Sequence, residues 1–171
     1  MNWMKQKIWI LACFFSISLA AQTVHLESDR IAYKSTVSVP NTSQVQLFFD
    51  AQKAIADNVT QEPALIQTDA INNEISGQGS IRLKSPYHLI KTLLYTIKLS
   101  VHDGGYQYQI DSVSLKEEER GGVTKVLSSK ELLKGMEVSG SSSWLMEEQL
   151  NEIDMNLQKV IAIIKDEMKR S

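Results

Sequence analysis

A hairpin between residues 93 and 115 constrains the fold more than any other part of this sequence. Apolar and polar residues alternate from Leu93 to Val101, which is the period of a strand with one buried face. Asp103-Gly104 follows, a pair typical of a two-residue turn whose central positions need positive φ angles. Pairing across this turn makes the two apolar faces coincide. The opposite residues would be Val101 and Tyr106, Leu99 and Tyr108, and Ile97 and Ile110.

The second strand of this hairpin needs a correction of phase. If Ile110 faces inward, strict alternation turns Val113 and Leu115 outward. We therefore predict a β-bulge near Asp111-Ser112, because one extra residue restores the buried face. The charged run from Glu117 to Arg120 is expected to be a solvated connection.

A strand and a helix are predicted ahead of the hairpin. Residues Ile31 to Val39 alternate as a first strand. Ser43 and Gln46 then form a capping box, which predicts an amphipathic helix from Gln44 to about Asn58. Its adjacent Phe48 and Phe49 are expected in the core, because an aromatic stripe on such a helix covers a sheet.

A second hairpin is predicted between Leu65 to Asp69 and Glu74 to Lys84, because turn-favouring Asp and Asn residues separate the two segments. Gly77 and Gly79 fall on the inward face of the second strand. Their missing side chains would let a helix approach closely or the strand bend.

Two helices are predicted near the carboxyl terminus. Ser128 with Glu131 makes another capping box, for a short helix from Ser129 to Lys134. From Trp144 to Lys169, apolar residues recur at spacings of three and four, which predicts a long helix. This helix can pack on its own sheet or pair with a second copy as a coiled coil. Packing within the chain is favoured, because so few heptads make an isolated coil marginal.

The amino terminus has the pattern of a signal peptide. Two lysines, Lys5 and Lys7, precede the apolar run Ile8 to Leu19. Small residues follow, so that cleavage after Ala20 or Ala21 is expected. The run is too short to span a bilayer comfortably. The alternative is a lipoprotein with Cys13 as the modified residue. The apolar run continues beyond Cys13, which argues against this alternative.

Charge and cysteine content exclude some functions of the mature chain. Removing the leader leaves 16 basic and 20 acidic residues, a net charge of −4. A nucleic-acid partner is not expected, because binding phosphate backbones requires a concentrated basic face. Without Cys13, the mature chain has no cysteine for a disulfide or for thiol chemistry.

Three stretches are distinctive when taken together: the helix from Ser43 to Asn58, the strand Ile75-Ser-Gly-Gln-Gly-Ser-Ile81, and the hairpin from Leu94 to Tyr108 around Asp-Gly-Gly-Tyr. They resemble a known family, the domain of unknown function 4468. The resemblance implies a β-α-β-β-β-β-α fold like that of the TATA-box-binding protein, secreted or periplasmic residence in Bacteroidota-type bacteria, and no assigned activity. A fold name carries no DNA-binding function, because function belongs to sites.

No local motif for catalysis or metal binding is present. His25, His88 and His102 lack zinc-type spacing and stand apart from carboxylates, so surface positions are expected for them. Gly77-Gln78-Gly79 lacks the third glycine and the following helix of a phosphate-binding loop. We expect neither a cofactor nor a metal, and no catalytic residues.

The predicted class is α+β: an antiparallel sheet of about five strands covered by helices, with a long C-terminal helix. The expected organisation is a signal peptide (1–20), a tail (21–30), one domain (31–135), a hinge (136–143) and the helix (144–171), which would pack on the domain.

The sequence favours an exported, noncatalytic binding or interaction domain of the bacterial envelope, in the periplasm or secreted. Its partner would be an unidentified envelope protein or ligand. The candidate interaction surface is Lys98, Ser100, Gln107, Gln109 and Trp144. The alternatives are an envelope hydrolase with a dispersed site, suggested by the same polar strand face, and a homodimer formed through the C-terminal helix.

Overall fold

The computed structural model describes residues 24–27, 30–60, 62–85, 89–119, 121–137 and 143–170, and side chains from Arg30 onward except those of residues 135–137 and 143–144. The predicted signal peptide and most of the predicted hinge lie outside these residues. The elements are β1 (Val24–Glu27), β2 (Arg30–Ser38), α1 (Gln44–Asn58), the 3-10 turn η1 (Pro63–Leu65), β3 (Ile66–Asp69), β4 (Glu74–Leu83), β5 (Leu89–His102), β6 (Gly105–Glu119), β7 (Thr124–Ser128), α2 (Ser129–Glu137) and α3 (Ser143–Glu167).

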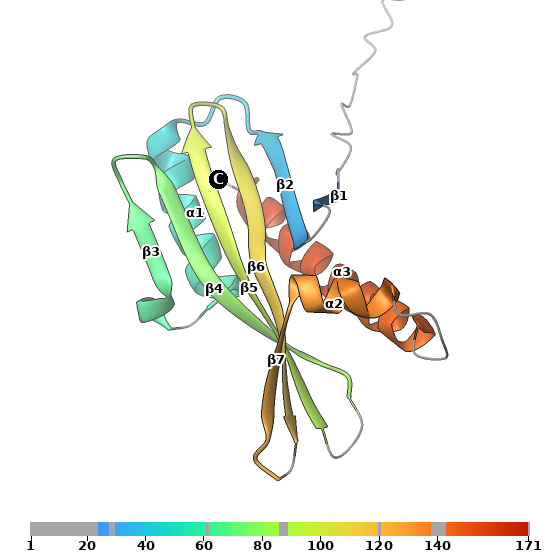
Figure 1. Cartoon of the computed structure of the whole chain (residues 1–171). Helices are drawn as coiled ribbons and strands as arrows, with labels where there is room; N and C mark the ends of the chain where they lie inside the picture. Colours follow the sequence, from blue (N-terminus) through green and yellow to red (C-terminus); the bar gives the residue numbers. More distant parts are fainter. Residues whose placement is uncertain are drawn as a thin grey trace, which may run out of the picture.

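These strands form one antiparallel sheet in the order β1-β2-β6-β5-β4-β3, and β7 also pairs with β6 (Figure 1). The α+β class predicted from the sequence is therefore confirmed. The sheet has seven strands instead of about five. The two strands without a prediction are β1 and β7.

One edge of β6 serves two partners. Residues 105–110 pair with β2, and residues 114–118 pair with β7. The change occurs at Ser112, whose φ angle is 52°, where the register with β5 shifts between Leu94 and Thr96. This irregularity is the predicted β-bulge, and it returns Val113 and Leu115 to the buried face.

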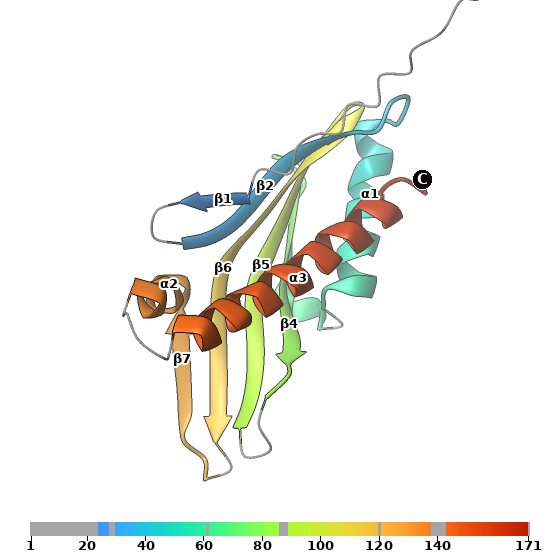
Figure 2. The same cartoon turned by 90° about the vertical axis from the view of Figure 1, so that its right-hand side faces the viewer.

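The helices α1 and α3 lie on one side of the sheet (Figure 2). The core forms between them and the inward-facing residues of β2, β4, β5 and β6. Leu47 and Ile55 of α1 are fully buried, as are Leu157 of α3 and Ile97 of β5. Since α1 and α3 pack on the same side, no element among the described residues covers the opposite face of the central strands.

The central hairpin has the register that its sequence predicts, from Val101 opposite Tyr106 to Ile97 opposite Ile110. Its tip also fixes α1, because the Gln44 backbone N–H donates to Asp103 Oδ1 at 2.8 Å. The Gln46 N–H donates to the Ser43 hydroxyl at 3.3 Å. These two acceptors satisfy N–H groups that the first turn of a helix leaves unpaired.

The prediction for the two phenylalanines of α1 is half wrong. Phe48 packs against the core, but Phe49 is 61% exposed and Val45, four residues earlier, is 67% exposed. The helix buries a different stripe, which is smaller because it contains two alanines. That stripe is Leu47, Ala51, Ala54 and Ile55.

The prediction of a solvated connection from Glu117 is also wrong, because β6 continues to Glu119. Lys91 of β5 lies opposite Glu117, and its ammonium is 3.3 Å from the Glu117 carboxylate. The same ammonium donates to Gln149 of α3 at 2.5 Å. Cross-strand and helix partners thus hold the charged run within the sheet.

Candidate functional site

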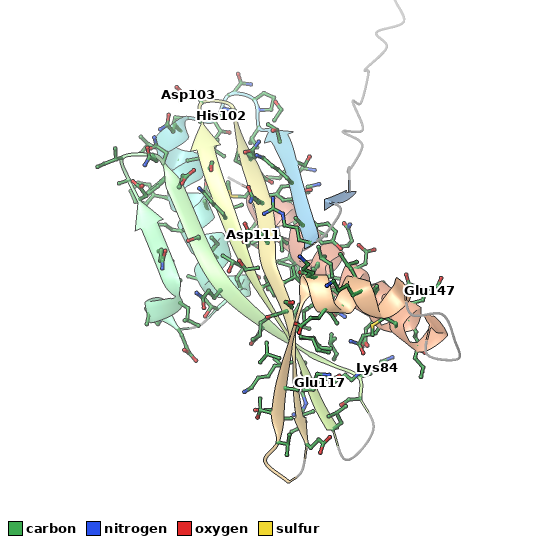
Figure 3. All side chains as sticks on the ribbon, in the orientation of Figure 1. Lys84, His102, Asp103, Asp111, Glu117 and Glu147 are labelled. Carbon is green, nitrogen blue, oxygen red and sulfur yellow. The ribbon has the colours of Figure 1, made fainter. Side chains whose placement is uncertain are left out.

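The face of the sheet that α1 and α3 leave uncovered is polar. Its side chains alternate with the buried ones along β4, β5 and β6, and Asp111 lies near its middle (Figure 3). Lys98 stands opposite Gln109, and Ser100 stands opposite Gln107. The structure therefore brings four of the five predicted interaction residues together. The fifth, Trp144, lies in the first turn of α3, and its side chain is outside the described part.

Three groups at the upper part of this face form a network. The Lys98 ammonium is 2.5 Å from Glu74 Oε2, and the Ser100 hydroxyl donates to Glu74 Oε1 at 2.9 Å. The hydrogen bond from Lys98 and then the one from Ser100 lower the pKa of Glu74. A carboxylate stabilised in this way is a poor general base, so the Ser100 hydroxyl is not activated as a nucleophile.

The two glutamines are also hydrogen-bonded within the protein. Gln107 donates to the Thr36 hydroxyl at 3.5 Å, and Gln109 donates to Asp111 Oδ2 at 2.8 Å. This upper part of the face is thus largely satisfied by its own contacts.

A cavity of about 640 Å³ lies beside β4, next to the start of β3, where Ile66 pairs with Gly77. Its strand lining comes from both faces of the sheet: Gln78, Ser80 and Thr96 belong to the polar face, whereas Gly79 and Tyr95 are buried positions of the face that the helices cover. The connection between α1 and β3 contributes Val59, Thr60, Glu62 and Leu65 to its wall. The strands contribute the rest of the described lining: Gln78, Gly79, Ser80, Leu94, Tyr95, Thr96, Ser112 and Ser114.

Several polar side chains in this cavity have no hydrogen-bond partner in the described part of the chain. They are the Gln78 amide and the hydroxyls of Ser80, Tyr95, Thr96 and Ser114. Within the same part, the side-chain polar atom that is both buried from solvent and without a partner is the Tyr106 hydroxyl. Tyr95 lines the cavity, although the residue is only 3% exposed. Burial raises the pKa of Tyr95 to about 12, so its hydroxyl stays protonated at neutral pH.

Gly79 makes room for this tyrosine. A Cβ at Gly79 would come within 2.2 Å of the Tyr95 ring carbon Cζ. Gly77 allows the close approach of a helix that its missing side chain predicts, since a Cβ there would lie 2.5 Å from Ile55 Cγ2 of α1. One glycine thus admits a helix and the other admits an aromatic ring.

The predicted interaction residues Lys98, Ser100, Gln107 and Gln109 do not line the cavity. Gln78, Thr96 and Thr60 were not among the predicted site residues, because a cavity wall formed by three strands and a loop leaves no local motif. The signal that could have found it is Gly79, an inward position of a strand that lacks a side chain.

No histidine is placed near the cavity in the described residues. His102 lies at the hairpin tip beside Asp103 (Figure 3), where its Nδ1 is 3.0 Å from the Asp103 carbonyl oxygen. The side chains of His25 and His88 are outside the described part. Within that part, no three histidine, cysteine or acidic side chains gather as metal ligands would.

None of the described helices combines the length and the apolar character that crossing a membrane requires. This holds for α3, the longest, whose exposed side carries lysines and acidic residues.

An antiparallel sheet with both long helices on one face defines an α+β protein of the TBP-like class. Solved structures share it. The chain is similar to a TBP-like protein from Parabacteroides distasonis ATCC 8503, with a TM-score of 0.69 and 11% identity, over 86% of this chain and 98% of that one. It is also similar to a DUF4468 family protein from Bacteroides ovatus ATCC 8483, with a TM-score of 0.62 and 10% identity, over 82% of this chain and 86% of that one.

Residues 33–116 match the family model described as a domain of unknown function (DUF4468) with TBP-like fold. This part of the chain is therefore a domain of that family, as the resemblance in the helix, the strand and the hairpin implied. No curated protein matches the chain. At these identities the solved structures establish the fold alone.

Proposed function

We propose that this chain is an exported, noncatalytic binding domain of the bacterial cell envelope, which holds its ligand at the cavity beside β4. The observation that carries the proposal is this cavity of about 640 Å³, with its unpaired amide and hydroxyl groups. Ligand sites are commonly concave and have a few convergent polar groups. The leader pattern from Lys5 to Ala20 supports export.

The absence of an activated nucleophile among the described residues supports a noncatalytic role. Ser100 is the serine of the face that contacts a carboxylate, and that carboxylate is held by Lys98. The hydrolase alternative depended on this polar strand face. None of the described contacts within the face activates a group for hydrolysis.

Export can be tested by expressing the full sequence in a bacterium and measuring the mass and the first residues of the product in the periplasmic fraction. Cleavage after Ala20 or Ala21 is the expected result. A product beginning at a lipid-modified Cys13 would support the lipoprotein alternative, and an uncleaved cytoplasmic product would overturn export.

Binding at this cavity and on the polar face beside it can be tested by photo-crosslinking in intact cells. A photoreactive amino acid at Gln78 or at Ser76 should give adducts with an envelope component. The matched control is the same amino acid at Lys159, which is exposed on α3 on the other side of the sheet. Equal adducts from Lys159, or none from the face, would overturn the proposal.

A further inference from the structure

The outer edge of β4 is paired along only part of its length. β5 accompanies β4 from Glu74 to Leu83, but β3 on the other side pairs only from Glu74 to Gly77. Among the described residues, no strand lies beside the remaining stretch from Gln78 to Leu83. The cavity of about 640 Å³ lies beside the first residues of this stretch instead. There is thus space where the sheet could continue.

The backbone groups of this stretch alternate between the two sides of β4, as in any antiparallel ladder. The Val101 N–H donates to the Asn73 carbonyl oxygen at 3.0 Å, and the register of β4 with β5 has no shift. Odd-numbered residues of β4 therefore bond to β5, and even-numbered residues direct their N–H and C=O groups to the outer edge. The first even-numbered residues meet β3 there, whereas Ser80 and Arg82 meet no strand of the described chain.

Other contacts limit both ends of the unpaired stretch. Before β3, the Leu65 N–H donates to the Glu62 carbonyl oxygen at 2.9 Å, so the chain turns in η1 instead of continuing along β4. At the other end, the Lys84 N–H donates to Glu152 Oε1 of α3 at 2.9 Å. Lys84 is an even-numbered position, and its partner lies away from β5, as the alternation requires. The open edge is therefore short, and an extended segment of about six residues would fill it.

An open edge of this kind can accept one more strand, because its unpaired N–H and C=O groups are a template for another chain. An antiparallel strand would exchange two hydrogen bonds with each of Ser80 and Arg82, and its alternate side chains would point to the two faces of the sheet. The cavity is lined by Val59 and Tyr95 on the covered face and by Ser80 and Thr96 on the polar face. A lining drawn from both faces is therefore what an added strand would contact.

The charges beside the open edge favour an acidic partner over a second copy of this chain. Arg82 and Lys84 are both exposed. If two copies paired their β4 edges about Ile81, the Arg82 side chains of the two copies would be diagonal neighbours on one face of the sheet. Their like charges would repel each other, whereas an acidic side chain of a partner segment would attract Arg82.

We infer that the outer edge of β4 binds an extended segment of a partner protein as an added antiparallel strand, through the backbone of Ser80 and Arg82. The segment carries an apolar side chain toward Val59 and Tyr95 and an acidic side chain beside Arg82. The inference rests on the proposed function, because it names the kind of ligand for the same cavity.

Hydrogen exchange of the full chain, labelled with ¹⁵N, tests the open edge before any ligand is added. The amides of Ser80 and Arg82 should exchange at least about tenfold faster than those of Gly79 and Ile81, because only the latter donate to β5. Equal protection of the two pairs would mean that the edge is already paired, and it would overturn the inference.

The probe is a phage library of random octapeptides, from which binders to the full chain are selected. Selected peptides should alternate apolar and polar residues and contain an acidic residue. One of them, made synthetically, should slow the amide exchange of Ser80 and Arg82. If no peptide is selected, or if the selected peptides protect amides elsewhere, the inference is wrong.

Variants of the edge test the backbone contact and the charge. Ser80→Pro removes the outward N–H and should weaken the selected peptide by about tenfold or more, whereas its control Ser80→Thr keeps the N–H and should bind as the native chain does. Proline suits this position, because edge strands tolerate it where the N–H faces solvent. Arg82→Glu should weaken the same peptide by a similar factor, since it brings like charges together. Native affinity in both Ser80→Pro and Arg82→Glu would contradict the inference.

Modified peptides give a test that does not depend on how the variants fold. N-methyl groups on every second residue remove the hydrogen-bond donors from one side of an added strand. Of the two possible sets, one should abolish binding, because its donors face β4, and the other should be tolerated. Equal loss from both sets, or loss from neither, would rule out an added strand.

Failure of the inference is distinguishable from failure of the proposed function. Crosslinks from Gln78 or Ser76 to a non-protein envelope component, or crosslinks that Ser80→Pro leaves unchanged, would overturn the added strand and still support binding at the cavity. Loss of all crosslinks from the native chain would remove both proposals. A native dimer that Ser80→Pro dissociates in analytical ultracentrifugation would assign the edge to a second copy, and it would overturn the partner segment.

Discussion

The ring of Tyr95 on β5 lies over Gly79 on the neighbouring strand β4, where a Cβ would be 2.2 Å from Cζ and 2.4 Å from the hydroxyl oxygen. The two residues are direct partners in the register of the sheet. A glycine at this position therefore leaves the space on the buried face of β4 that the aromatic side chain occupies.

Gly79→Ala should destabilise the protein by about 1–3 kcal/mol, because the added methyl overpacks the Tyr95 ring. Urea denaturation measures this loss, and the near-ultraviolet circular dichroism of tyrosine should change with it. Gly121→Ala is the control, because a Cβ there would meet no atom within 4 Å. An unchanged urea midpoint for Gly79→Ala would show that the ring is not fixed against the strand.

Gly77→Ala tests the contact between β4 and α1. A Cβ at Gly77 would lie 2.5 Å from Ile55 Cγ2, so the substitution should cost about 1–3 kcal/mol by overpacking. Ile55→Ala alone should cost about 2–5 kcal/mol, because Ile55 is fully buried. The double variant should lose less than the sum, since the new methyl occupies space that the isoleucine leaves. Strictly additive losses in urea denaturation would contradict direct contact.

Tyr33→Phe tests the link between β2 and α3. The Tyr33 hydroxyl donates to Asp154 Oδ1 at 2.7 Å. Its loss should cost about 1–2 kcal/mol at neutral pH, because Asp154 keeps partial access to water. Burial, and then the hydrogen bond to Asp154, raise the pKa of Tyr33.

The pH dependence of this cost has a defined sign. The raised pKa means that the folded state holds the phenolic proton more tightly, so the stabilisation is fully present below the unfolded tyrosine pKa of about 10. It is lost as the pH rises above that value toward the folded pKa. The difference between native and Tyr33→Phe urea midpoints should therefore be constant up to about pH 9 and shrink at higher pH. A difference that grew above pH 10 would contradict this assignment.

The central hairpin and the bulge could be predicted because their information is local. Asp103-Gly104 fixes the turn, the alternation fixes the register, and the phase error between Ile110 and Val113 reveals the extra residue at Ser112. Phe49 was predicted to be buried because of its large aromatic side chain, but it is exposed. The buried stripe of α1 has helical spacing too, but its alanines carry little hydrophobic signal.

Glu117 and the strand β7 show what local patterns cannot reveal. A run of acidic residues is normally solvated, and only the distant partner Lys91 places Glu117 in a strand. β7 is short and mostly exposed, so it has no apolar alternation. The cavity escapes prediction for a similar reason, because its wall combines the loop around Thr60 with strands that follow it in the chain.

The last prediction separates the two uses of α3 that heptad spacing allows. Leu157 is fully buried in the core that α3 shares with the sheet, whereas Met155 is 57% exposed. Leu157→Ala should cost about 2–5 kcal/mol in urea denaturation, and Met155→Ala should change the stability by less than about 0.5 kcal/mol. Because the seam of α3 is occupied by its own sheet, analytical ultracentrifugation should give a monomer mass for native protein and for both variants. A dimer that Met155→Ala dissociates would instead place the exposed side of α3 in an interface between copies.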